Sequence, residues 1–210
     1  MGGWIQSIIR IIVIIWDMKN HCLRWRISSK IRRLNRRGVP VIFMISGNNS
    51  SGKTVVTRTL IQTLPFSQSV NLGLASKMIK YFRPDIDSTE LENFNGNEAS
   101  KIFNELLEFM IDSYVTTGVN VIFDGVQVSS KSLNSRSITG GVFLDVRKEI
   151  SLKRGDRPET HFNRIIGKLK KVKYVESDKF IRVDNNGRID DAVTKVLEAL
   201  DQLLDKQING

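Results

Sequence analysis

The octapeptide at residues 47–54, Gly-Asn-Asn-Ser-Ser-Gly-Lys-Thr, constrains this chain more than any other feature. It fits the pattern G-x-x-x-x-G-K-[ST], in which glycines let the backbone turn tightly enough for successive N–H groups to surround a phosphate. The apolar run 39–46 before it predicts a buried strand, and residues 55–61 after it predict the first turns of a helix. This order predicts an α/β domain with a phosphate site at a helix N-terminus.

Two side chains of the octapeptide have distinct chemical roles. Lys53 can reach the β- and γ-phosphates of a nucleotide, and the Thr54 hydroxyl can ligate Mg²⁺. An ordinary Gly/Ser/Asn turn is the alternative, and the strand and helix patterns on either side argue against it. We therefore expect ATP and Mg²⁺ as cofactors, with the nucleotide bound by Gly47, Asn48, Asn49, Ser50, Ser51, Gly52, Lys53, Thr54 and Val55.

Apolar segments continue to alternate with helical patterns along the rest of the chain. Strands that alternate with helices give a three-layer α/β/α fold with a mostly parallel sheet, here of about five strands. The polar run 85–97 is a candidate loop or lid. We predict further strands at 67–72, 119–124, 141–146 and 180–183, and helices at 75–82, 98–117, from 148, 161–171 and 190–204.

Asp124 ends one of these apolar strands and is the candidate for the second half of the site. Ligands of such sheets bind at the C-terminal ends of the strands, where the octapeptide and Asp124 would both lie. The Asp124 carboxylate could help to hold Mg²⁺ or take a proton from an acceptor hydroxyl. A turn-forming pair of Asp124 with Gly125 is a structural alternative that can coexist with this role.

A second group of candidates is basic. Phosphoryl transfer spreads negative charge over the moving group, and guanidinium donors on a flap can follow that charge. A solvated charge run is the alternative for Arg154 and Arg157, which have Lys153 and Arg164 nearby. We predict catalytic roles for Lys53, Asp124, Arg154 and Arg157, and metal ligation by Thr54 and Asp124.

The net charge of +10 is unevenly spread. Residues 1–37 hold nine basic residues against one acidic, and residues 147–173 hold ten against three. The rest of the chain is therefore mildly acidic. Because this is not the pattern of a protein that coats nucleic acid uniformly, each basic segment needs its own explanation.

The first 37 residues differ from the rest of the chain. Residues 4–16 are strongly apolar but too few for an ordinary membrane span. We predict that 1–37 is a helical segment ahead of one domain at 38–210. A second stripe at helical spacing lies among arginines and lysines, at Leu23, Ile27, Ile31 and Leu34.

Three interpretations of this segment remain open. A basic amphipathic stretch beside an apolar one is typical of an interfacial anchor, which would give peripheral membrane contact through residues 4–37. The segment could instead pack on the domain or on a second subunit. Alternatively, translation begins at Met18, which would leave residues 1–17 outside the working protein.

The cysteine and histidine content excludes some kinds of site. Cys22 is the only cysteine, so no intramolecular disulfide can form, which suits a reducing compartment and predicts a cytoplasmic protein. His21 and His161 are the only histidines and are far apart in sequence, so a histidine or cysteine metal cluster is not expected.

The order of these parts resembles the P-loop kinases of small molecules, a family that includes nucleoside, nucleotide and 2-phosphoglycerate kinases. The resemblance covers roughly residues 39–205, and its specific motif is the phosphate loop. The segment 121–127 is similar to one in 2-phosphoglycerate kinases, although Gln127 stands where a histidine is expected, and 161–164 is similar to a His- and Arg-containing element. The resemblance implies the P-loop NTPase fold.

The leading hypothesis is an ATP-dependent phosphotransferase that moves the γ-phosphoryl group to a hydroxyl or phosphate of a small molecule. A membrane-associated P-loop ATPase or nucleotide-sensing protein is the first alternative. A nucleic-acid kinase or binder is the second, and sparse aromatic residues around the basic run 24–37 argue against it. The chain has no Asn-Lys-x-Asp tetrapeptide for reading guanine, so a GTPase is not favoured.

Overall fold

The computed structural model describes residues 2–48, 50–66, 68–85, 98–125, 138–155 and 178–210, with the side chains of residues 2–17, 99 and 100 excluded. In chain order the elements are α1 (Gly2–Asn35), β1 (Ile42–Gly47), α2 (Lys53–Thr63), β2 (Gln68–Asn71), α3 (Leu72–Phe82), α5 (Glu98–Thr117), β3 (Val121–Asp124), β4 (Gly140–Asp145), α7 (Lys148–Arg154), β5 (Phe180–Asp184) and α9 (Ile189–Asn209).

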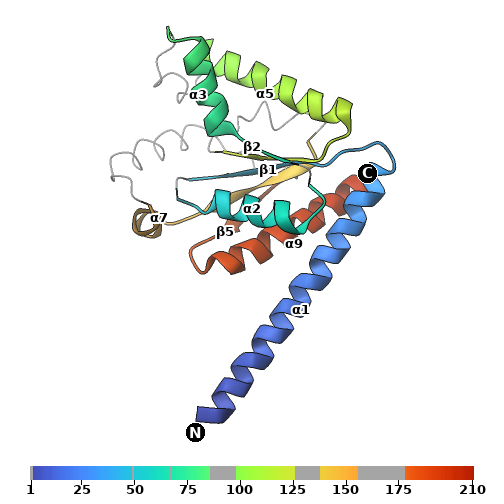
Figure 1. Ribbon diagram of the computed structural model, residues 1–210, viewed down its shortest axis with the longest axis vertical. Coiled ribbons are helices and arrows are strands. Elements are labelled where there is room, and N and C mark those ends of the chain that lie inside the picture. Colours follow the sequence, from blue (N-terminus) through green and yellow to red (C-terminus); the bar gives the residue numbers. More distant parts are fainter. Residues whose placement is uncertain (1, 49, 67, 86–97, 126–137, 156–177) are drawn as a thin grey trace.

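The five strands form one sheet in the order β2-β3-β1-β4-β5, and every pair is parallel. Helices cover both faces, so the described residues form the three-layer α/β/α arrangement predicted from the sequence (Figure 1). The predicted strands and helices in these ranges are present, with ends shifted by a few residues. The predicted helix 161–171 and most of the candidate lid 85–97 lie outside the described residues.

Alternate side chains of the central strand β1 pack on opposite faces of the sheet. Phe43 and Ile45 lie in the cluster formed with α1, α2 and α9, whereas Ile42 and Met44 lie in the cluster formed with α3 and α5. All four side chains are fully buried. Because both faces are covered, the strand is a continuous apolar run rather than an alternating one.

The second half of α1 is part of the core. Its apolar stripe packs against α9 and the sheet, and none of the four side chains is more than 5% exposed. The stripe therefore faces the protein and cannot serve as the apolar face of an interfacial anchor. The residues concerned are Leu23, Ile27, Ile31 and Leu34.

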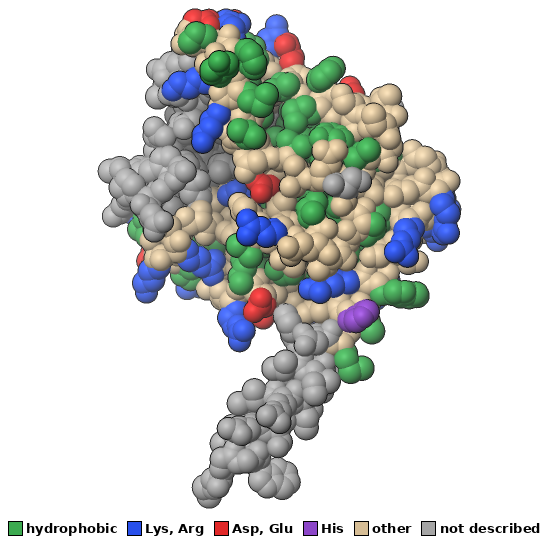
Figure 2. Space-filling model, in the orientation of Figure 1, with side chains coloured by type: hydrophobic (Ala, Val, Ile, Leu, Met, Phe, Trp, Pro, Cys, Tyr) green, Lys and Arg blue, Asp and Glu red, His purple; other side chains and the backbone are tan. Residues whose placement is uncertain are grey.

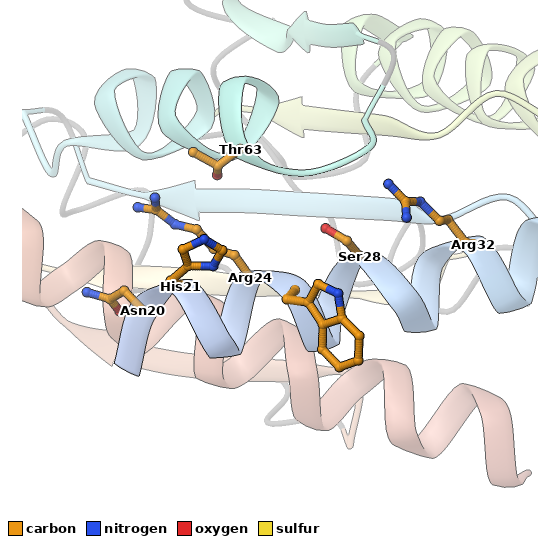
Figure 3. A pocket seen from close by; sticks show the side chains of 7 residues that line it. Asn20, His21, Arg24, Ser28, Arg32 and Thr63 are labelled. Atoms are coloured by element: carbon orange, nitrogen blue, oxygen red, sulfur yellow. The ribbon is translucent and has the colours of Figure 1, made fainter. Parts of the chain in front are cut away.

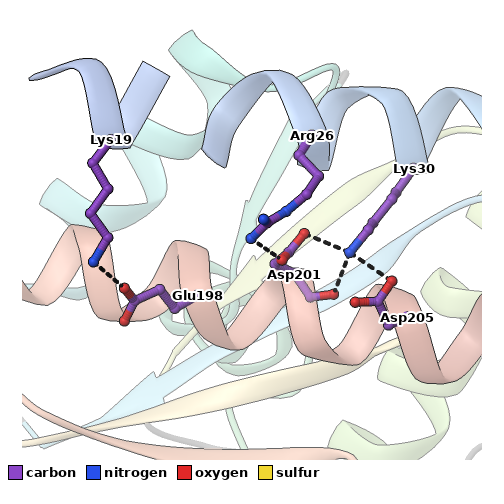
Figure 4. Close-up of polar contacts among 6 residues, drawn as sticks. All are labelled: Lys19, Arg26, Lys30, Glu198, Asp201 and Asp205. Atoms are coloured by element: carbon purple, nitrogen blue, oxygen red, sulfur yellow. Dashed lines mark hydrogen bonds and ion pairs between the residues drawn. The ribbon is translucent and has the colours of Figure 1, made fainter. Parts of the chain in front are cut away.

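The second half of α1 also forms a row of ion pairs with α9 (Figure 4). Lys19 pairs with Glu198 at 3.0 Å, Arg26 with Asp201 at 2.5 Å, and Lys30 with Asp201 and Asp205 at 2.7 and 2.6 Å. Residue numbers rise together along both helices, so α1 and α9 run parallel. Three interpretations were open for residues 1–37. For the side chains described in the second half of α1, packing on the domain is the one that holds.

The first half of α1 extends away from the body of the molecule (Figure 1). No helix in the described part of the chain is long and apolar enough to cross a membrane. Membrane contact, predicted through residues 4–37, stays a prediction for the segment before Met18. The domain boundary at residue 37 also stays a prediction.

Exposed large apolar side chains gather on α3 and α5, where they form much of the upper surface in Figure 2. This surface borders the C-terminal edge of the sheet, because α3 starts directly after the last residue of β2. The most exposed members are Leu74, Met78, Tyr81 and Phe82 of α3 and Phe109 of α5.

Candidate nucleotide-binding site

The sheet register brings the octapeptide and Asp124 together. Strands β1 and β3 are neighbours, and Ile45 is opposite Asp124, two residues before β1 ends at Gly47. The N–H of Gly125 donates to the carbonyl of Ile45 at 3.0 Å, which continues the pairing past the strand end. The loop and the carboxylate therefore lie at the same C-terminal edge, as the sequence predicts.

Two glycines of the loop occupy positions that other residues would not fit. Gly47 has φ +150°, and a Cβ atom there would lie 2.6 Å from the carbonyl oxygen of Leu144 on β4. Gly52 has φ +84°, and a Cβ atom there would lie 2.6 Å from Ile189 of α9. Backbone of this kind, packed closely against its neighbours, is suited to a cradle in which main-chain N–H groups can surround a phosphate.

Lys53 is the first residue of α2, and its side chain folds back over the loop. Its Nζ donates to the carbonyl oxygens of Gly47 and Asn48 at 3.0 and 2.7 Å. Burial lowers the pKa of Lys53 to about 8, and the nearby Asp124 carboxylate opposes this shift. A phosphate entering the loop would offer this ammonium group a stronger acceptor than the carbonyls.

Asp124 is buried, with only 5% of its surface exposed. Its Oδ1 accepts a hydrogen bond from Asn71 Nδ2 at 3.2 Å. Burial raises the pKa of Asp124, while the charge of Lys53 and the Thr57 hydroxyl act to lower it. Asn71 and Thr57 were not among the residues that sequence patterns identified, because neither belongs to a motif.

Two buried polar atoms, one at the end of β1 and one in the loop, have no partner among the described residues. The Oδ1 of Asn48 and the Oγ of Ser46 are buried and accept or donate no hydrogen bond among the described residues. Orphaned polar atoms are rare in protein interiors and often mark places where a ligand or bound water supplies the partner. This observation fits a nucleotide in the cradle.

The donors at this edge also fit Mg²⁺. Mg²⁺ is usually bound by one or two protein oxygens together with phosphate oxygens and waters, rather than by an all-protein cage. Thr54 is exposed at the start of α2, and Asp124 ends β3, the strand next to β1. The described residues hold no cluster of three or more carboxylate, histidine or cysteine side chains.

Arg154 is the last residue of α7 and contacts the turn between β5 and α9. Its guanidinium donates to the carbonyl oxygens of Asn185 at 2.9 Å and Gly187 at 2.6 Å. The next residue, Gly155, is so close to Ser50 of the loop that a Cβ atom there would lie 2.2 Å from the serine Oγ. The structure thus places the end of α7, where the predicted flap begins, against the phosphate loop. The Arg154 guanidinium itself contacts the β5–α9 turn.

Asn185 is a residue of the site that sequence reasoning missed. Its Nδ2 donates to the carbonyl oxygen of Ser51 at 2.6 Å, which ties the β5–α9 turn to the phosphate loop. The sequence Asn185-Asn186-Gly187 signals only a turn, and nothing in it indicates the distant acceptor. Arg154 and Asn185 together brace the loop from one side.

Two predicted site residues cannot be placed. Asn49 of the loop and Arg157 of the flap lie outside the described residues. The catalytic, nucleotide-binding and metal-ligating roles of the other site residues stay predictions.

Comparison with known proteins identifies the fold. No protein-family model matches the sequence, and no curated protein matches it. Among solved structures, a gluconokinase from Sinorhizobium meliloti 1021 superposes with a TM-score of 0.60 at 12% identity, covering 80% of this chain and 96% of that one.

Two further structures give the same result. A sugar kinase from Janibacter sp. HTCC2649 has a TM-score of 0.58 at 16% identity, covering 77% of this chain and 95% of that one. Shikimate kinase from Aquifex aeolicus vf5 has a TM-score of 0.50 at 20% identity, covering 76% and 96%. At these identities the likeness concerns the fold. This chain has the three-layer fold of the P-loop small-molecule kinases.

Proposed function

We propose that this protein is an ATP-dependent phosphotransferase that moves the γ-phosphoryl group to a hydroxyl group of a small molecule. One observation carries the proposal: the Lys53 ammonium group is held inside a glycine-shaped loop, beside the buried Asp124 carboxylate. A positive charge for phosphates and a carboxylate for metal or proton chemistry are the two groups that phosphoryl transfer requires.

Each side chain has a stated task in this proposal. Lys53 neutralises phosphate charge and keeps the triphosphate in the loop. Thr54 and Asp124 are the protein oxygens that would hold Mg²⁺, which supplies charge neutralisation between the phosphates when bound. Asp124 also can accept the proton of the attacking hydroxyl, because burial raises its affinity for a proton.

The choice of a hydroxyl acceptor has support from the comparisons. The three similar structures are named as kinases of gluconate, of a sugar and of shikimate. These are small hydroxyl compounds, and the proposal carries this chemistry over to the present chain. The 2-phosphoglycerate kinase likeness of 121–127 stays a prediction, because residues 126 and 127 are not among those described.

The test is a search for a phosphorylated product. The protein is incubated with Mg²⁺, labelled ATP and a panel of sugars, sugar acids, polyols, nucleosides and phosphoglycerate, and products are identified by mass. We expect one class of hydroxyl compound to gain a phosphoryl group. Lys53→Ala should lower the rate by about 100-fold or more, because it removes a charge that stabilises the transferred group.

Lys101→Ala is the matched control, since that lysine is exposed on α5 and forms a long ion pair with Glu105, at 3.9 Å. It should leave the rate unchanged. ATP hydrolysis with no phosphorylated product from any acceptor would contradict the kinase proposal and favour a P-loop ATPase.

A further inference from the structure

The helix α1 presents three sides to its surroundings. Successive residues of a helix are 100° apart, so its apolar stripe, its ion pairs to α9 and a third set of polar side chains fall on separate sides. The third side faces α2 and carries positive charge. Its members in the described part of α1 are Asn20, His21, Arg24, Trp25, Ser28 and Arg32.

A groove of about 510 Å³ lies between this side of α1 and the C-terminal end of α2. Figure 3 shows His21 and Arg24 toward one end of the groove below Thr63, Arg32 toward the other end, and Ser28 between them. The volume is in the range of small-molecule sites. It lies apart from the phosphate loop, because Thr63 is the last residue of α2 whereas the loop lies at the start of that helix.

The charges in this groove are not neutralised. No ion pair or side-chain hydrogen bond joins His21, Arg24 or Arg32 to another described residue, whereas Lys19 and Lys30 on the neighbouring side pair with carboxylates of α9. The Nε of Arg24 is buried and has no acceptor among the described residues. A buried guanidinium donor without a partner is unusual and points to an absent acceptor.

The end of α2 does not supply that acceptor. The carbonyl groups at a helix C-terminus amount to about half a negative charge. Arg24 and Arg32 each carry a full positive charge. Because their sum exceeds the partial negative charge at the end of α2, the groove has an excess of positive charge. A guanidinium group presents its donors as a planar fork that matches the oxygens of a phosphate.

We propose that the groove between α1 and α2 binds a phosphate-bearing ligand, with Arg24 and Arg32 donating to phosphate oxygens. Trp25 is 71% exposed, so its indole offers a flat apolar surface to the group attached to the phosphate. The phosphate could belong to a soluble phosphomonoester or to a lipid headgroup, and the same donors would serve both. The proposal does not depend on the reaction at the phosphate loop.

The experiment uses Trp25 as a local reporter. The chain has three tryptophans, and the Trp4→Phe/Trp16→Phe variant of the full chain leaves only Trp25, which lies in the groove. Phenyl phosphate and inorganic phosphate are titrated while the fluorescence of this variant is followed. MgADP is kept at saturation so that the phosphate loop does not compete for the probe. We expect a saturable change with phenyl phosphate.

Two variants test the assigned donors. Arg24→Gln/Arg32→Gln should weaken the binding of phenyl phosphate by about 10-fold or more, because charge-assisted hydrogen bonds to phosphate are lost. The matched control is Arg33→Gln/Arg36→Gln, which removes the same charge from exposed positions of the same segment outside the groove. It should leave affinity within about 2-fold at 0.15 M salt, where distant charges are screened.

Thr63→Glu tests the same site from the other helix. It places a carboxylate in the groove without touching α1, so it should also weaken binding of phenyl phosphate. Circular dichroism spectra and melting temperatures identify any variant that has lost its fold. This variant keeps the proposal testable if the double arginine variant fails to fold.

The source of the phosphate is distinguished by vesicles. Phosphatidylcholine vesicles with and without phosphatidic acid are added to the same reporter variant. A response to phosphatidic acid alone indicates a headgroup, a response to phenyl phosphate alone indicates a soluble ligand, and both outcomes support the proposal. The proposal is overturned if neither phenyl phosphate nor phosphatidic acid changes the fluorescence, or if the control variant loses as much affinity as Arg24→Gln/Arg32→Gln.

Discussion

Lys53 at the start of α2 and Asp124 at the end of β3 are opposite charges close enough for each to alter the proton affinity of the other. Burial lowers the pKa of the lysine and raises that of the carboxyl group, while the attraction between them partly reverses both shifts. Groups of this kind cluster at functional sites because their proton affinities are brought toward neutral pH.

Asp124→Asn separates a catalytic role from a structural one. The amide keeps the shape and can still meet Asn71, and it removes a charge whose burial costs stability. We expect the melting temperature to be no lower than that of the native protein and phosphoryl transfer to fall by about 100-fold. Steady-state kinetics and thermal unfolding measure the two effects.

Asp145→Asn is the control for this prediction, because Asp145 ends strand β4, on the other side of β1, and forms an ion pair with Arg182 at the surface. It should keep normal activity. If Asp124→Asn also keeps normal activity, the carboxylate serves only the turn with Gly125.

The affinity for MgATP should depend on pH through Lys53. With a pKa of about 8 in the free protein, the side chain is protonated below pH 8 and increasingly neutral above it. The phosphates favour the charged form, so above pH 8 binding must be accompanied by uptake of a proton. We expect the dissociation constant to rise by up to about 10-fold per pH unit above pH 8.

Binding titrations between pH 7 and 9.5 measure this dependence, with Lys53→Ala as the variant that should lose it. A dissociation constant that is flat across this range would show that the lysine ammonium group does not contribute to binding.

The helices α1 and α9 show why the role of an element can stay open when only the sequence is known. The stripe Leu23, Ile27, Ile31 and Leu34 among basic residues has the pattern of an interfacial helix, and the same pattern suits a helix that packs on a protein surface. The acidic residues that neutralise the basic side lie about 180 positions later, on α9. Only the fold shows that the two helices are neighbours.

The ion pairs of these helices should differ in their contribution to stability. Asp201 is buried and meets both Arg26 and Lys30, so Asp201→Asn leaves a half-buried ammonium with one partner fewer. We expect it to lower the free energy of unfolding by about 1–3 kcal/mol. Glu198→Gln is the control, because its pair with Lys19 is exposed and worth less than about 1 kcal/mol.

Chemical denaturation at low and high salt measures both variants. The reverse order, with Glu198→Gln the more costly change, would contradict the burial of the Asp201 cluster.

Across the whole molecule, the order of elements could be predicted much better than the contacts between them. The strand, loop and helix around Gly47 and Lys53 follow from local patterns, because glycine spacing and apolar runs are properties of neighbouring residues. The support of Ser51 by Asn185 and the engagement of Arg154 with the β5–α9 turn could not be predicted. These contacts join residues more than 30 positions apart through backbone carbonyls, which carry no sequence signal.

Truncation tests the place of α1 in the molecule. The four stripe residues from Leu23 to Leu34 are each worth about 1.5–3 kcal/mol of burial, which together is comparable to the stability of an ordinary domain. Removal of residues 1–37 should therefore leave a protein that does not fold or is insoluble. Removal of residues 1–17 should leave the melting temperature nearly unchanged.

Thermal unfolding and cell fractionation of both truncations give the answer, and fractionation of the shorter truncation also tests membrane contact through the first part of α1. A chain lacking residues 1–37 that unfolds at the native temperature would contradict the packing of α1 in the core.

The central claim is that the loop at residues 47–54 binds the phosphates of a nucleotide through the Lys53 ammonium group. Equilibrium dialysis with labelled MgATP at pH 7 tests it most directly. We expect saturable binding with one site per chain in the native protein and a loss of affinity of about 100-fold in Lys53→Ala. Binding that is absent in the native protein, or equally tight in Lys53→Ala, would contradict the claim.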